Sequence, residues 1–186
     1  SMAACRLLLH LQHNEQIDAI HCHDWHTGLV PLLIKIHPDF YKLHDIYRLF
    51  TVHNLEYQGT RPFAAFGNLQ GFLDWYTDLA HLEPEIFEPY LDQHADIPCI
   101  NPMRAALYSA DRVTTVSPSY AKEICLKDSP ETDFLGGRGL EEDFADLFAT
   151  RRLTGIANGI DIEFYDPQKM RHPYTHKNRA EGRERN

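Results

Sequence analysis

The sequence has few features of several common protein classes. Its four cysteines lie far apart and form no CxxC pair, which argues against a disulfide framework and a cysteine zinc site. No apolar run approaches the roughly 20 residues that span a bilayer, and no segment has the pattern of a secretory signal peptide. Acidic residues outnumber basic ones, 27 to 18. We therefore expect a globular protein with reduced thiols, and neither nucleic acid nor a membrane as its partner.

The chain does contain a regular alternation of helix-like and strand-like segments. Apolar residues at helical spacing predict helices over residues 3–12, 28–36, 102–110, 117–126 and 140–148. Runs of apolar and β-branched residues predict strands at residues 17–22, 46–52, 113–116 and 153–157. This alternation predicts an α/β fold with a parallel, Rossmann-like sheet and helices on both of its faces.

Three other segments depart from this rhythm. Residues 55–99 hold eight acidic residues and one arginine together with many aromatics, and we interpret them as an insertion-like excursion with short helices near 69–79 and 84–91. The glycine-rich residues 136–139 are expected to form a flexible turn. Residues 168–186 are polar and basic, so residues 1–167 are predicted to form one domain and the rest a polar tail or the start of an interdomain linker.

Polar residues follow every predicted strand. Because the carboxyl ends of parallel strands share one edge of a sheet, these residues are expected to converge on one cleft. In chain order they are His23-Asp24, His53-Asn54, Ser117-Pro118 and Asn158-Gly159.

The most informative run, HCHDWHTG, follows the first predicted strand. His21, His23 and His26 fall at the three histidine positions of HxHxDH, the metal-binding signature of metallo-β-lactamase-like hydrolases. That motif requires aspartate where this chain has Trp25, and Asp24 comes one residue early, where the side chain points the other way. A metal-dependent hydrolase that uses these histidines is therefore an alternative function.

Four blocks of sequence resemble the bacterial glycogen synthases and plant starch synthases. In order, they are HDWHTGLVP, FTVHNLEYQG, YSADRVTTVSPSYAKEI and LTGIANGIDIEFYDP. The resemblance implies part of the N-terminal, acceptor-side domain of a GT-B fold, whose two Rossmann-like domains enclose the active site. It implies transfer of glucose, with retention of configuration, from ADP-glucose or UDP-glucose to the non-reducing end of an α-1,4-glucan. It also implies no metal or other cofactor, and a bacterial cytoplasm or plastid stroma as location.

The same resemblance assigns the candidate site residues. Asp24 and His53 match the family's active-site aspartate and histidine and are the predicted catalytic residues. A carboxylate and oriented polar groups suit a transfer in which positive charge develops on the sugar. Asn54 and Asn158 match family residues near the reacting sugars. Tyr57 and Gln58, which follow the His-Asn pair, are expected to face the acceptor. Trp25 and His26 shape the first turn. These predicted substrate-binding residues are Asn54, Asn158, Tyr57, Gln58, Trp25 and His26.

Some of the family's machinery has no match in this sequence. The Lys-x-Gly-Gly loop is expected upstream of residue 1, and the second domain, with the cations that hold the donor diphosphate, is expected downstream of Pro167. Arg104 and Ala106 stand where the family usually has lysine and glycine. We therefore expect an inactive fragment of a glucosyltransferase, with a non-catalytic glucan-binding module as a further alternative.

Overall fold

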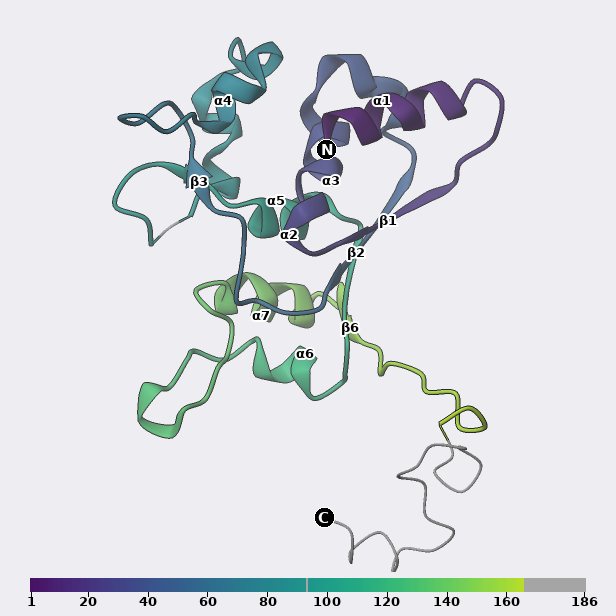
Figure 1. Ribbon diagram of the computed structural model, residues 1–186, viewed down its shortest axis with the longest axis vertical. Coiled ribbons are helices and arrows are strands. Elements are labelled where there is room, and N and C mark those ends of the chain that lie inside the picture. The colour runs from purple at the N-terminus through teal and green to yellow at the C-terminus, as the bar shows by residue number, and fades with distance from the viewer. Residues whose placement is uncertain (93, 166–186) are drawn as a thin grey trace, which may run out of the picture. The chain divides into compact units, whose positions relative to one another are not determined.

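The computed structural model describes residues 1–92 and 94–165. The chain divides into two compact units, Ser1–Ile156 and Ala157–Asn186. All helices and strands assigned in the described residues belong to the first unit (Figure 1). The tail or linker predicted at residues 168–186 lies outside the described residues. None of the helices in these described ranges is both long and apolar enough to cross a membrane.

The first unit contains a four-stranded parallel sheet with the order β1-β2-β5-β6. These strands are β1 (Ala19–His23), β2 (Tyr47–Val52), β5 (Arg112–Thr115) and β6 (Leu153–Gly155). The α/β fold with a parallel sheet and flanking helices is confirmed. Each of the four predicted strands is present, with ends shifted by at most two residues.

The helices that flank the sheet also follow the predicted pattern. They are α1 (Met2–Leu11), α2 (Asp24–Thr27), α3 (Leu29–Ile36), α5 (Pro102–Ser109), α6 (Tyr120–Glu123) and α7 (Glu141–Ala149), with the 3-10 helix η1 (Pro38–Leu43) after α3. α6 is much shorter than predicted, because after Ile124 the hydrogen bonds tighten to turns in which the N–H groups of Cys125 and Leu126 donate to carbonyls three residues back. The Ser117 hydroxyl still accepts a hydrogen bond from the Tyr120 N–H, as an N-terminal cap does.

The core lies between one face of the sheet and the helices. Cys22, Phe50, Val113 and Leu153 are aligned across the four strands and all four are buried. α3 and α5 pack together over this face, and a Cβ atom at Gly28 would lie 2.3 Å from the carbonyl oxygen of Pro102. Glycine at this position therefore allows the close approach of the two helices.

The opposite face of the sheet is more open. His21 and His23 of β1 and Thr154 of β6 are exposed, and Leu49 of β2 is half-buried. Helices were predicted on both faces. Since each strand pairs with the next one along the chain, right-handed crossovers bring their helices to one face. Figure 1 shows α5, α6 and α7 to the same side, the left, of β2 and β6.

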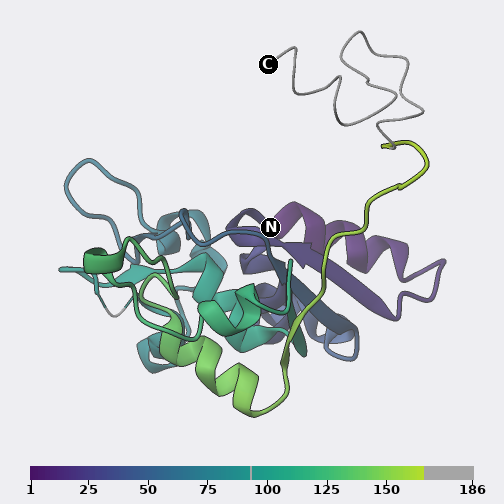
Figure 2. The ribbon, with the colours of Figure 1, turned by 90° about the horizontal axis from the view of Figure 1, so that it is seen from below.

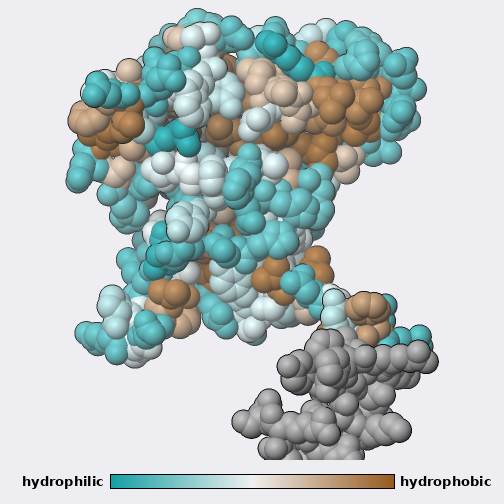
Figure 3. Space-filling view, in the orientation of Figure 1, coloured by the Kyte–Doolittle hydropathy of each residue, from teal (hydrophilic) through white to brown (hydrophobic). Residues whose placement is uncertain are grey.

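The excursion at residues 55–99 folds into short elements around its own aromatic cluster. β3 (Arg61–Pro62) pairs with β4 (Cys99–Ile100), and the predicted helices reduce to α4 (Phe72–Trp75) and the 3-10 turns Thr77–Leu79, Pro84–Ile86 and Glu88–Tyr90. The rings of Phe72 and Phe87 are buried with centroids 5.9 Å apart. In Figure 2 the carboxyl end of β1 points toward this excursion. Figure 3 shows hydrophobic patches on this face of the molecule both near α1 and, at the left, over the excursion, where Phe66 and Leu69 are exposed.

Candidate functional site

Asp24 lies at the junction between β1 and α2 and connects two strand ends. Its φ of 51° is in the left-handed region, which is uncommon for a residue other than glycine. Its Oδ1 atom accepts a hydrogen bond of 2.8 Å from the His53 N–H, at the end of β2. The turn is closed by Thr27, whose hydroxyl bonds both the N–H and the C=O of His23 at 2.7 Å. The two predicted catalytic residues are therefore in direct contact.

The histidines near this junction form a connected row on the open face of the sheet. His53 Nε2 lies 3.0 Å from His23 Nδ1, and His21 Nε2 lies 2.6 Å from the Thr51 hydroxyl. The Thr51 hydroxyl in turn bonds that of Thr114 at 2.6 Å. Partial burial, and then the neighbouring His23 and His53, lower the pKa of His21. A neutral imidazole is the form that can accept as well as donate in such a row.

The alternative of a metal-dependent hydrolase requires His21, His23 and His26 to converge, and they do not. His26 stacks on Trp25, with ring centroids 4.0 Å apart, while the other two histidines bond to residues of the neighbouring strand. Among residues 1–92 and 94–165, no three metal-ligating side chains are arranged to share one ion. The geometry does not support that alternative.

The loop after β2 lies over Trp25. Gly59 has a φ of 76°, and a Cβ atom there would lie 2.4 Å from Cε3 of the Trp25 indole. The Gln58 carbonyl accepts a hydrogen bond from Met103 N–H, in the first turn of α5. Glycine is therefore required for the loop to lie on the indole, and α5 fixes its far end.

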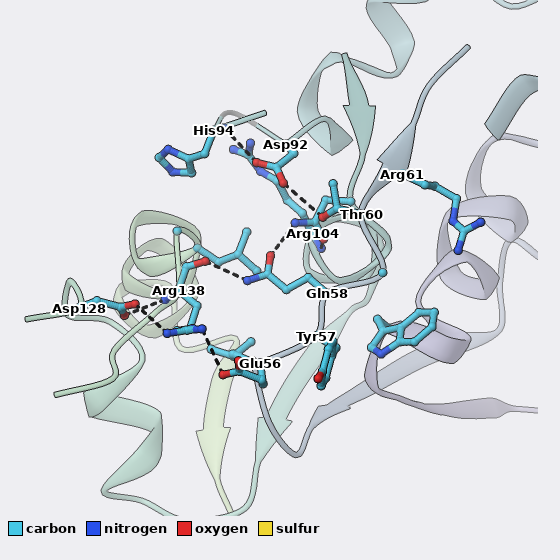
Figure 4. A pocket seen from close by; sticks show the side chains of 16 residues that line it. Glu56, Tyr57, Gln58, Thr60, Arg61, Asp92, His94, Arg104, Asp128 and Arg138 are labelled. Atoms are coloured by element: carbon cyan, nitrogen blue, oxygen red, sulfur yellow. Dashed lines mark hydrogen bonds and ion pairs between the residues drawn. The ribbon is translucent and has the colours of Figure 1, made fainter. Parts of the chain in front are cut away.

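A cavity of about 610 Å³ opens beside this loop (Figure 4). Trp25, Tyr57 and Gln58, three of the predicted substrate-binding residues, contribute to its lining. The remaining wall is mostly polar and charged. It is formed by Glu56, Thr60 and Arg61 of the same loop, Asp92, His94, Asn101 and Arg104 around β4, and Asp128, Arg138 and Gly139 before α7. Such a concave polar site with aromatic rings suits a ligand rich in hydroxyl groups.

The predicted loop residues have different environments. Tyr57 lines the cavity and is 72% exposed. Both polar atoms of the Gln58 amide are hydrogen-bonded. Its nitrogen donates to the Arg138 carbonyl at 2.9 Å, and its oxygen accepts from Asn101 Nδ2 at 2.6 Å. The Asn54 side chain accepts from the Glu56 N–H at 2.9 Å, as in an Asx turn. Gln58 and the Asn54 oxygen thus shape the loop, while the exposed Tyr57 faces the cavity.

Asn158 belongs to the second unit and is exposed there. In the same unit Asp161 accepts hydrogen bonds from Phe164 N–H through its side chain and from Tyr165 N–H through its carbonyl, both at 2.9 Å. Asp161 therefore orders the turn after the Asn-Gly pair. The convergence of Asn158 with the other strand ends stays a prediction.

Sequence reasoning missed the residues that close the cavity on its far side, above all Arg138. The segment 136–139 was expected to be a flexible turn, and the chain does turn at Arg138 and Gly139, with the glycines packed closely against other segments. A Cβ atom at Gly136 would lie 2.0 Å from the Leu126 carbonyl oxygen, and one at Gly139 would lie 2.9 Å from the His94 ring. Three glycines around one arginine were the available signal, since glycines at a close approach of two chain segments fix the residue between them.

The fold and the site define an α/β domain with a ligand cavity beyond the carboxyl ends of its parallel strands. Residues 1–146 match the family model described as the starch synthase catalytic domain, and the chain belongs to this family. The resemblance found in the four sequence blocks is thereby confirmed.

Individual relatives agree with this assignment. The glycogen synthase of Geobacillus thermodenitrificans is 39% identical over 171 residues, which cover 88% of this chain and 30% of the relative. That of Streptococcus mutans is 37% identical over 163 residues, covering 86% and 29%. The solved catalytic domain of starch synthase IV from Arabidopsis thaliana, bound to ADP and acarbose, matches with a TM-score of 0.61 and 31% identity, covering 92% of this chain and 30% of that one. The chain spans about 30% of the length of these relatives.

Proposed function

We propose that this chain supplies the acceptor side of a glucosyltransferase site that extends an α-1,4-glucan with glucose from ADP-glucose or UDP-glucose. Its family membership supports the reaction class. The observation that carries the proposal is the hydrogen bond between Asp24 and His53 at the carboxyl ends of β1 and β2, beside a polar cavity of about 610 Å³. The related starch synthase IV binds ADP and acarbose, a nucleotide and an oligosaccharide analogue. The bacterial and plant relatives favour a bacterial cytoplasm or a plastid stroma for the whole protein.

In this reaction the bond from the sugar C1 to the diphosphate breaks, and a bond from C1 to the 4-hydroxyl oxygen of the glucan end forms on the same face. The hydroxyl proton leaves with the diphosphate. The carboxylate of Asp24, held by the His53 N–H, stabilises positive charge that develops at C1. The imidazole of His53 and the Nδ2 atom of Asn54, whose oxygen holds the loop, bond sugar hydroxyls, and the ring of Tyr57 packs on the glucan. Asn158, in the second unit, keeps the substrate-binding role that its sequence motif predicts. The proposal requires no metal or cofactor.

The experiment is glucan elongation by the full-length protein, followed as release of ADP or UDP from each donor with a maltooligosaccharide acceptor. Asp24→Asn is expected to lower the rate by about 10²–10³-fold, the usual effect of removing one electrostatic stabiliser of a transition state. Asp45→Asn, at an exposed position before β2, is the matched control and is expected to keep the wild-type rate.

Two outcomes contradict the proposal. Wild-type activity in the Asp24→Asn variant removes Asp24 from the site. A full-length protein that binds maltooligosaccharide but transfers no glucose from either donor is a glucan-binding module instead. The 186-residue chain alone is expected to bind glucan without turnover, because it holds only about 30% of the length of its relatives.

A further inference from the structure

One residue holds both neighbours of the exposed Tyr57. Arg138 Nη2 lies 3.1 Å from Glu56 Oε2, and the Arg138 carbonyl accepts a hydrogen bond of 2.9 Å from the Gln58 amide. Figure 4 shows Arg138 reaching the loop from the opposite wall of the cavity, with the side chains of Glu56 and Gln58 directed toward it and Tyr57 farther away. The aromatic ring at the cavity is therefore positioned by contacts that its neighbours make to a residue 80 positions away.

Arg138 is itself fixed. Its φ is 54°, in the left-handed region, and its neighbour Gly137 is so closely packed that a Cβ atom there would lie 2.5 Å from the backbone of Glu141. The Asp128 carboxylate accepts from the Arg138 N–H at 3.2 Å and lies 3.4 Å from Nη1 of its guanidinium. The guanidinium thus joins two carboxylates, a geometry for which arginine is better suited than lysine.

The other end of the loop is anchored to the core. Gln58 Oε1 accepts a hydrogen bond of 2.6 Å from Asn101, a side chain that is 2% exposed. Asn101 also caps α5, because its Oδ1 accepts from the Arg104 N–H at 3.0 Å. The loop that carries Tyr57 is therefore held between a buried helix start on one side and Arg138 on the other.

We propose that Arg138 is a positioning residue for the glucan, which it serves by holding the Tyr57 ring at the cavity. This inference rests on the proposed function. An exposed aromatic ring offers a flat apolar surface to the carbon face of a sugar, and the carboxylates of Glu56, Asp92 and Asp128 line the same cavity and accept from hydroxyls. A ring fixed before binding loses less conformational entropy on binding, so the contribution of Arg138 falls on affinity for the glucan rather than on the chemical step.

The first test separates binding from chemistry in the full-length protein. Arg138→Ala is expected to raise the KM for a maltooligosaccharide about three- to tenfold, as loss of a partly exposed ionic network allows, with kcat and the KM for the donor unchanged. Arg138→Lys, which retains the charge that faces Glu56 and Asp128, is expected to recover part of the loss, while the backbone carbonyl that Gln58 bonds is present in both variants. Tyr57→Ala is expected to give the same increase as Arg138→Ala, and the double variant little more. Arg6→Ala, on the exposed side of α1, is the control.

The second test needs no turnover. NMR relaxation of the 186-residue chain is expected to show greater picosecond-to-nanosecond mobility at the Tyr57 amide in Arg138→Ala than in wild type or Arg6→Ala. An unchanged Tyr57 overturns the inference, as does an unchanged glucan KM in an active enzyme or a rise in the KM of both substrates with a loss of kcat. A wild-type enzyme that transfers no glucose overturns the proposed function, whereas the mobility measurement still decides whether Arg138 holds the loop.

Discussion

Asp24 combines an unfavourable backbone conformation with a hydrogen bond that only a side-chain acceptor at this position can make. Left-handed φ values at non-glycine residues concentrate at functional sites, where the surrounding structure holds them. Asparagine tolerates this conformation and keeps a side-chain oxygen, whereas alanine does neither. The two substitutions therefore separate the charge of Asp24 from its structural role.

Asp24→Asn is expected to keep the free energy of unfolding within about 0.5 kcal/mol of wild type. Asp24→Ala is expected to lower it by about 1–3 kcal/mol, from the left-handed conformation and the lost bond to the His53 N–H. Urea unfolding of the 186-residue chain measures both. Equal losses of stability in the two variants would contradict this prediction and assign the effect to the charge of Asp24 rather than to its backbone conformation and hydrogen bond.

Arg104 and Asp143 form an ion pair that is almost fully buried, with both side chains 7% exposed. Arg104 Nε and Nη2 each lie 3.1 Å from a carboxylate oxygen of Asp143, and the Tyr108 hydroxyl donates to the same group at 2.9 Å. Arg104→Ala is expected to destabilise the fold by about 3–5 kcal/mol, because it leaves the Asp143 carboxylate buried without its cation. Arg104→Lys, the residue usual in the family, is expected to cost less. Thermal and urea unfolding of both variants measure these losses of stability. The prediction is contradicted if Arg104→Ala destabilises the fold less than Arg104→Lys does.

At the scale of elements, the spacing of apolar residues predicted the strands and helices. It did not predict the side-chain contacts between distant segments that form the cavity. The four strands were predictable because their apolar and β-branched runs are distinct, and Asp24 and His53 because each follows such a run. α6 was predicted too long because helical spacing continues past Glu123, whereas the chain must turn to bring Gly136 against Leu126. Arg138 was missed because its contacts join segments about 80 residues apart, which no local pattern records.

The starts of β2 and β5 are joined by Arg48 and Asp111. The Asp111 carboxylate accepts from the Arg48 N–H at 2.7 Å and from its guanidinium at 3.0 Å, and the Asp111 N–H returns a bond to the Arg48 carbonyl at 2.8 Å. Partial burial acts to raise the pKa of Asp111, but the hydrogen bonds from Arg48 outweigh it and lower the pKa below its ordinary value. The ionised carboxylate therefore stabilises the sheet at neutral pH, and this contribution is lost as the pH falls through the folded-state pKa.

Asp111→Asn is expected to lower the unfolding midpoint at pH 7. The difference from wild type is expected to shrink as the pH falls below about 4, the ordinary range of a carboxyl group. Asp45→Asn is the exposed control. A difference that stays constant from pH 7 to pH 3 would assign the effect to packing rather than to ionisation.

At the scale of the whole molecule, the hydrogen bonds of the sheet in the first unit extend to Ile156, its last residue. The N–H of Ile156 donates to the Thr115 carbonyl at 2.7 Å, directly after the last strand. A chain that ends at residue 156 is therefore expected to unfold within about 2 °C of the 186-residue chain, a difference of less than ~1 kcal/mol. A chain that ends at residue 152 lacks β6 and the buried Leu153, and is expected to unfold well below both. Circular dichroism on heating compares the three, and a large loss in the first truncation contradicts the division into units.

The order of the strands has a consequence for how the chain is made. Each strand of the sheet pairs with its predecessor in the sequence, so the sheet can grow in the direction of synthesis. About 60 residues separate β2 from β5, and a ribosome adds them in about 3 to 12 seconds. During that interval β2, with Phe50 and Val52, presents an unpaired apolar edge of the kind that recruits foreign strands. The nascent chain is therefore most exposed to misassembly while the excursion that builds its ligand cavity is still being translated.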